Sequence, residues 1–202
     1  MILNFMKTKY LIPIISLLIF LGGCSVSYKE LSTLNIKKPR NFQEHILFEY
    51  KKRATFEAEE MHDWNSAKLY SEKALRSLQT DEIYPEKISY WKLPKENFNE
   101  IRIAYDNLMA IYKDAKKIDP FNLARAISSL DCWSEQQEEN WQTWDINSCK
   151  NDFLNAMHNI YEKISINEKE QESSNNKERN SKNKTIDEVT IVTKNKNEEL
   201  MQ

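Results

Sequence analysis

Three cysteines, at positions 24, 132 and 149, are the side chains of this chain best suited to covalent chemistry. Cys132 and Cys149 are not spaced as a Cys-X-X-Cys motif, and no histidine lies at ligand spacing from either one. We therefore predict neither a metal site nor a redox pair for them. A disulfide or two ordinary buried thiols remain, and the cellular compartment decides between these outcomes.

The acids and histidines give weaker indications of a site. The three histidines are scattered along the chain, which favours surface or packing roles over catalysis: His45, His62 and His158. Four neighbouring acids resemble the carboxylates of a wall-cleaving hydrolase in type, but they alternate with apolar positions as a solvated helix face does: Glu57, Glu59, Glu60 and Asp63. We predict no catalytic residue.

Tryptophans are the only candidates for a binding surface. Flat rings stack well on apolar faces of sugars or peptides, and Trp91, Trp141 and Trp144 are placed where they could line a groove. Packing in the core or over one end of it is the favoured interpretation of these rings and of Trp133. We therefore name these tryptophans only as candidates and assign no binding residue.

The composition excludes several classes of protein. Among 202 residues there are only 2 glycines and 5 prolines, too few for the turns of a many-stranded sheet or for a phosphate-binding glycine loop. The formal net charge is -2, without the basic excess that nucleic-acid binding needs. A mainly helical chain with no nucleic-acid partner and no bound cofactor follows.

The amino end has the pattern of an export leader. Lys7 and Lys9 form a short basic region, and 11–21 is almost wholly apolar. A stretch of about 11 residues is too short to cross a bilayer, which takes about 20. We predict a signal peptide over 1–23.

That leader ends in Leu21, Gly22, Gly23 and Cys24, which resembles the lipobox of bacterial lipoproteins. The resemblance implies that signal peptidase recognises the first three residues and that Cys24 carries diacylglyceryl and N-acyl groups, including palmitate. Each buried methylene contributes roughly 0.8 kcal/mol, so two or three acyl chains hold a protein on a membrane. Ser25, where an aspartate would favour the inner membrane, points to the periplasmic leaflet of the outer membrane.

Hydrophobic periodicity predicts an all-α chain, about five helices in one bundle. The spacing predicts helices over 41–61, 64–78, 96–117, 120–134 and 145–166, the fourth fading within the acidic run 135–139. We interpret 24–40 as a lipidated tether, 41–166 as the helical domain and 167–202 as a disordered polar tail. Within that tail only 185–193 alternates as a strand does.

Antiparallel packing of the last two helices would bring Cys132 near Cys149. In the oxidising periplasm such a pair forms a disulfide if its Cα atoms come within roughly 7 Å. A bridge closing this loop would contribute on the order of 3 kcal/mol. We therefore predict a Cys132–Cys149 disulfide.

Two further resemblances lie inside the helical domain. The run 63–75, Asp-Trp-Asn-Ser-Ala-Lys-Leu-Tyr-Ser-Glu-Lys-Ala-Leu, looks like the second half of a tetratricopeptide repeat, so we expect one TPR-like hairpin. Several segments within 42–164 resemble the amino-terminal helical region of alphaproteobacterial OmpA-family lipoproteins: 42–45, 50–52, 56–58, 61–64, 131–138 and Cys149. That family's peptidoglycan-gripping domain is not expected here, because 167–202 is too short and polar to form it.

These features predict a non-enzymatic outer-membrane lipoprotein. Its helical module would face the periplasm and serve envelope organisation or protein-protein interaction, with another envelope protein as the expected partner and the lipid anchor as its contact to the membrane. The alternative is a peptidoglycan-associated binder or a cell-wall enzyme, for which the tryptophans and acids are the only indications.

Replacing Cys24 tests the anchor. A Cys24→Ser chain should lose the acyl groups and leave the membrane fraction, which intact mass and fractionation will show. Recovery of this variant in membranes at the usual mature size, with no lipid on the unaltered protein, would contradict the prediction.

Overall fold

The fold is taken from a computed structural model that describes residues 26–199, with side chains from 26 to 173. The predicted leader and lipobox, Leu21 to Cys24, lie outside the described residues. The chain divides into two compact units, 1–160 and 161–202, and each is treated by itself.

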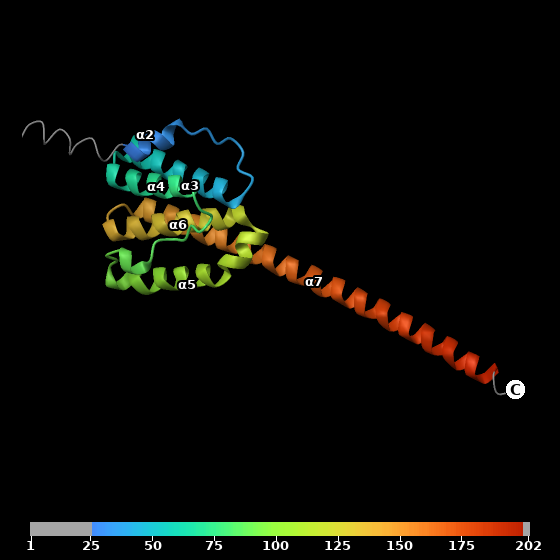
Figure 1. The fold of residues 1–202 in the computed structure, drawn as a ribbon. Coiled ribbons are helices and arrows are strands. Elements are labelled where there is room, and N and C mark those ends of the chain that lie inside the picture. The colour runs from blue at the N-terminus through green and yellow to red at the C-terminus, as the bar shows by residue number, and fades with distance from the viewer. Residues whose placement is uncertain (1–25, 200–202) are drawn as a thin grey trace, which may run out of the picture. The chain divides into compact units, whose positions relative to one another are not determined.

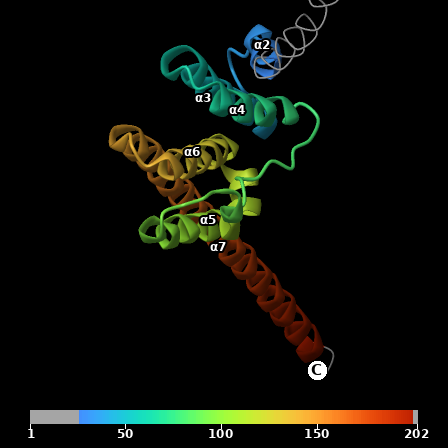
Figure 2. The ribbon, with the colours of Figure 1, turned by 90° about the vertical axis from the view of Figure 1, so that its left-hand side faces the viewer.

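Every regular element in the described part of the first unit is a helix, which confirms the predicted all-α bundle. Its α-helices are α2 (Val26–Thr33), α3 (Phe42–Phe56), α4 (Trp64–Arg76), α5 (Lys95–Ile118), α6 (Pro120–Glu139) and the first part of α7 (Thr143–Glu199). Two short elements join them, the π-helix η1 (Glu57–Met61) and the 3-10 helix η2 (Ile88–Tyr90). Helix α6 lies between the α3–α4 pair and α5, and it contacts both α3 and α5 (Figures 1 and 2).

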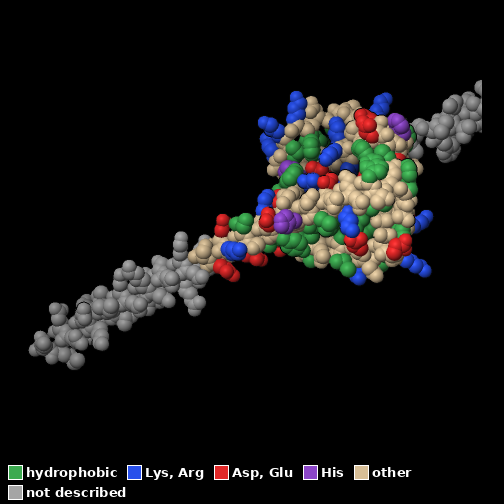
Figure 3. Space-filling model, turned by 180° about the vertical axis from the view of Figure 1, so that it is seen from behind, with side chains coloured by type: hydrophobic (Ala, Val, Ile, Leu, Met, Phe, Trp, Pro, Cys, Tyr) green, Lys and Arg blue, Asp and Glu red, His purple; other side chains and the backbone are tan. Residues whose placement is uncertain are grey.

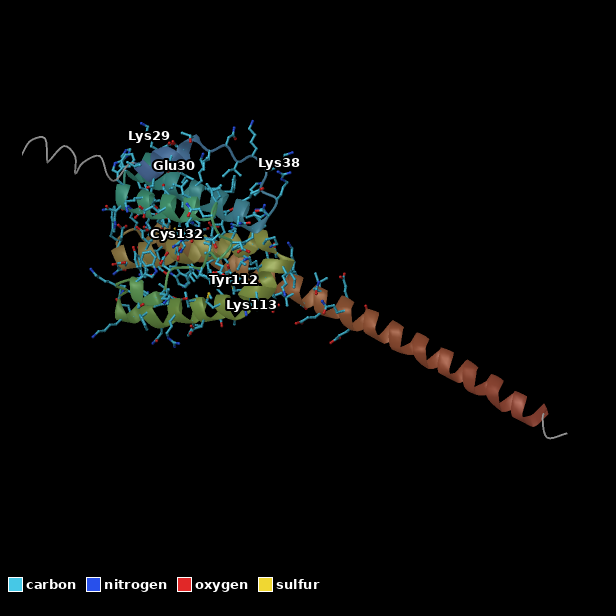
Figure 4. All side chains as sticks on the ribbon, in the orientation of Figure 1. Lys29, Glu30, Lys38, Tyr112, Lys113 and Cys132 are labelled. Carbon is cyan, nitrogen blue, oxygen red and sulfur yellow. A yellow bond between two sulfur atoms is a disulfide. The ribbon has the colours of Figure 1, made fainter. Side chains whose placement is uncertain are left out.

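Helix α6 is the centre of this arrangement. Every residue from Asn122 to Gln137 except Arg125 is buried, although many of them are polar. A helix buried on all sides is usually apolar all round, so its polar groups need partners inside the protein. Figure 4 marks Cys132 on this helix.

The predicted hairpin is formed by α3 with η1 and by α4. Its two arms approach through alanines that are at most 2% exposed: Ala54, Ala58, Ala67 and Ala74. Small side chains permit close approach of two helices, as the sequence pattern predicted. Asn41 and Asp63 cap the two arms, since their side chains accept backbone N–H groups of the first turns.

A buried ion pair joins the hairpin to α6. Lys73 of α4 pairs with Asp131 of α6, and both side chains are 2% exposed. The Tyr50 hydroxyl donates to Asp131 Oδ2 at 2.6 Å, and the backbone N–H of Glu86 donates to Oδ1 at 2.7 Å. Asp131 therefore ties α3, α4 and the 77–94 connection to the central helix.

Part of the predicted tether, 24–40, is helical. Residues 26–33 form α2, whose Leu31 is fully buried and which contacts α3 and α4. The Lys51 ammonium donates to the carbonyls of Ser32 and Leu34 at the end of this helix. A cation at a helix carboxyl end stabilises its unpaired carbonyls, an interaction that local periodicity does not reveal.

The last two predicted boundaries also differ. Helix α6 does not fade in the acidic run but continues to Glu139, and Asn140 ends it in the left-handed conformation that asparagine tolerates (φ 54°). Helix α7 continues through most of the predicted tail to Glu199, including the strand-like stretch 185–193. The chain has no proline or glycine after Pro120, so no strong helix-breaking residue interrupts this segment.

Loss of the buried cation should destabilise the fold strongly. Lys73→Met leaves Asp131 buried without its ionic partner, and we expect the free energy of unfolding to fall by about 3–5 kcal/mol. Urea unfolding followed by circular dichroism measures the difference. The matched control is Lys68→Met, whose side chain pairs with Glu72 on the surface and should change stability by less than about 1 kcal/mol. Equal losses in the two variants would contradict this role for Lys73.

Candidate functional site

A pocket of about 390 Å³ lies beside the Cys132–Cys149 pair, and we call it the disulfide pocket. It is lined by residues of α3 (Lys52, Arg53, Thr55, Phe56), η1 (Glu57, Glu59, Glu60), α6 (Cys132) and the first turns of α7 (Trp144, Asp145, Ser148, Cys149, Asp152). All of these belong to the first unit. The pocket therefore draws on the hairpin, the central helix and the start of the last helix.

The disulfide forms one wall of this pocket. Cys132 and Cys149 are joined in the structure, and their Cα atoms lie 5.7 Å apart. This agrees with the pairing predicted from two consecutive antiparallel helices. The bridge fixes the first turns of α7 against α6.

The backbone at the opposite wall departs from regular helix. η1 widens the end of α3 into a π-helical turn, in which the N–H of His62 donates to the carbonyl of Glu57. The N–H of Asp63, just beyond the turn, donates to the same carbonyl at 2.9 Å. His62 then takes a left-handed conformation, φ 58°. Single π-turns and positive φ at a non-glycine residue are found disproportionately at functional sites. Here they position Glu57, Glu59 and Glu60 on the pocket.

Arg53 is the less exposed of the two cations that line the pocket. Its Nη2 donates to Ser129 Oγ at 2.8 Å, its Nη1 donates to Cys149 Sγ at 3.6 Å, and Asp152 lies 3.9 Å away. Asp152 is also held by Arg125 at 2.6 Å. Both terminal nitrogens of the guanidinium are thus engaged by the pocket wall, whereas Nε is buried without a hydrogen-bond partner among the described side chains.

Two buried carboxyls face like charges. Glu57 is 2% exposed, and burial, together with the carboxylates of Glu135 and Asp145, raises its pKa to about 8. Asp145 is 5% exposed, and burial raises its pKa while Arg53 lowers it. Over the part of the chain whose side chains are described, Asp145 Oδ2 is one of a few buried polar atoms with no hydrogen-bond partner.

A second group of acids lies behind Glu57. Burial raises the pKa of Glu135 to about 7, although hydrogen bonds from Ser66 and Gln136 lower it. One carboxylate oxygen from each of Asp63, Glu135 and Glu139 lies within 4.8 Å of the others. The atoms of Cys132, Asp145 and Cys149 are equally close, but both sulfurs belong to the disulfide.

The structure separates the three candidate tryptophans. Trp144 is 59% exposed on the disulfide pocket, and its ring meets Phe56 edge-on with centroids 6.4 Å apart. Trp141 is 69% exposed beside Glu139 and does not line this pocket. Trp91 is buried, as is Trp133, in agreement with the packing interpretation.

The expectation of a solvated acidic face is wrong at Glu57, which is buried. The alternation of acids with apolar residues over 57–63 suggested exposure, but the π-helical turn η1 buries the Glu57 side chain. Sequence reasoning also missed Arg53 and Asp145, since it assigned Asp145 only to a helix start. His45 packs against the Phe121 ring and His62 Nδ1 lies 3.3 Å from the Ala58 carbonyl, both consistent with the predicted packing roles.

A second, more open pocket of about 570 Å³ lies over the 77–94 connection. Tyr84, Tyr90 and Tyr105 line it together with Arg76 and Glu86. On the face shown in Figure 3, hydrophobic side chains are interspersed with charged ones. The disulfide pocket is the better candidate site because it combines an exposed indole with buried charged groups.

Comparison with known proteins returned no counterpart: no family model, no curated protein and no solved structure matches the chain. Across the described residues, none of the helices combines the length and apolar character needed to span a bilayer.

The raised pKa of Glu57 predicts a stability that falls with pH. Between the ordinary carboxyl value of 4.5 and about 8, the folded chain retains a proton that the unfolded chain loses. The free energy of unfolding should therefore fall as pH rises through this range, by at most about 1.4 kcal/mol per pH unit for this carboxyl.

Glu57→Gln should remove that part of the slope and leave the part due to Glu135. Urea unfolding at a series of pH values measures both slopes. Glu60→Gln, an exposed position of the same π-turn, is the control and should keep the slope of the unaltered chain. A Glu57→Gln profile parallel to the unaltered one would show that Glu57 does not titrate this way.

Proposed function

We propose that this chain is a lipid-anchored, non-enzymatic helical module on the periplasmic face of a bacterial outer membrane, and that it binds another envelope protein at the disulfide pocket. The sequence supports the address through the lipobox-like run that ends at Cys24. A disulfide is compatible with an oxidising compartment. The resemblance to OmpA-family lipoproteins is consistent with the same location.

The observation that carries the binding role is the exposed ring of Trp144 at the rim of a pocket with buried charges. Tryptophan and arginine are enriched among the residues that dominate protein interfaces, particularly where they border a preformed pocket. The disulfide holds this rim in place before any partner arrives, and a preorganised surface loses less conformational entropy on binding.

Site-specific photocrosslinking in the producing cells tests this role. A photoreactive amino acid at position 144 of the full chain should give a discrete crosslinked product with one envelope protein, identified by mass spectrometry. The control is position 103, an isoleucine that is 52% exposed on α5 and should not give that product. Identical products from both positions, or none from position 144, would contradict the proposal.

A cell-wall enzyme or binder is the second candidate, and Glu57 is the observation that favours it. A carboxyl group protonated at neutral pH beside other carboxyls is the arrangement that glycoside hydrolysis uses for its general acid. Incubation of the purified full chain with sacculi separates the two candidates. Release of fragments that is lost in Glu57→Gln would support the enzyme, and co-sedimentation alone would support the binder.

A further inference from the structure

The lining of the disulfide pocket carries more acids than bases. Five acids (Glu57, Glu59, Glu60, Asp145 and Asp152) face two bases, Lys52 and Arg53. Asp152 is already shared by two arginines, and Glu59 accepts from the Tyr28 hydroxyl at 2.7 Å. The remaining negative charge at neutral pH lies on Glu60 and Asp145, while Glu57 adds a protonated carboxyl group.

Asp145 adds an observation independent of this charge count. Its side chain is almost fully buried, and Oδ2 has no hydrogen-bond partner among the described residues. A buried carboxylate oxygen without a donor costs stability, so a donor supplied from outside would be strongly favoured. Glu135, Glu139 and Asp145 all lie close enough to Glu57 to interact with it electrostatically, and hydrogen bonds from a cation to such carboxyl groups are stronger than those from a neutral donor.

The rim suits the aliphatic part of a long basic side chain. Phe56 and Trp144 present two rings at right angles, and Trp144 is more than half exposed. Lysine and arginine bury their methylene stems on apolar surface, and their cationic ends are attracted to indole faces. The volume of the pocket is near the lower end for ligand sites, which fits one side chain rather than a helix.

We propose that the disulfide pocket receives one lysine or arginine side chain of the partner protein, with its cationic end at Asp145 and Glu57 and its stem against the exposed ring of Trp144. This inference rests on the proposed binding role and specifies the chemistry of the partner at that site. An anionic partner group would meet the acidic surplus, and both terminal nitrogens of Arg53 are already engaged by the pocket wall.

Two matched peptides test the need for a cation. Fluorescein-labelled Gly-Gly-Arg-Gly-Gly and its citrulline counterpart, a neutral isostere, are titrated with the full chain in mild detergent, and anisotropy reports binding. We expect the arginine peptide to bind at least about tenfold more tightly, the factor that one charge-assisted hydrogen bond provides. Equal binding of the two peptides, or preference for a glutamate peptide, would overturn the proposal.

Variants of the chain locate the interaction. Asp145→Asn and Trp144→Ala should each weaken the arginine peptide about tenfold, whereas Trp141→Ala and Glu96→Gln, exposed positions outside the pocket, should not. Trp144→Ala keeps the test valid if Asp145→Asn does not fold. Undiminished binding in Trp144→Ala would overturn the proposal, and crosslinking from position 144 would then show whether the binding role itself survives.

Discussion

The buried contact between Lys73 and Asp131 is the constraint on which the rest of the first unit depends. Two opposite charges inside a protein are tolerated only when each is paired and hydrogen-bonded, and here the donors come from three different segments. The pair therefore does more than attract one helix to another. It fixes which face of the polar helix α6 meets the hairpin, and so determines which residues of α6 reach the disulfide pocket.

The position of α6 explains why polar side chains gather at one end of the bundle. Its last buried turns carry Glu135, Gln136 and Gln137 into the region where η1 and α7 begin. The π-helix η1 contributes the carboxyl group of Glu57 and helix α7 contributes that of Asp145, and Arg53 balances these acids only in part. The same packing that holds the core together thus produces an electrostatically unbalanced pocket beside it.

Periodicity was sufficient to predict the helical class and the approximate limits of the helices from α3 to α6, and the resemblance of 63–75 to a tetratricopeptide repeat predicted the hairpin. Antiparallel connection of α6 and α7 was also sufficient to pair the two cysteines. The hydrophobic pattern did not show which polar residues are buried, because it is read from apolar side chains, whereas Glu57, Lys73 and Asp131 are charged. Their burial is determined by contacts between segments far apart in the chain, which no local spacing records.

The sulfur bridge in the pocket wall also has a consequence for timing. A recognition surface closed by a covalent link between α6 and α7 takes its final shape only after two thiols have lost their hydrogens to an oxidant. A freshly synthesised chain in a reducing environment would therefore lack the finished surface. The chain would then become able to bind a partner only after the disulfide has formed, in the compartment where oxidation takes place.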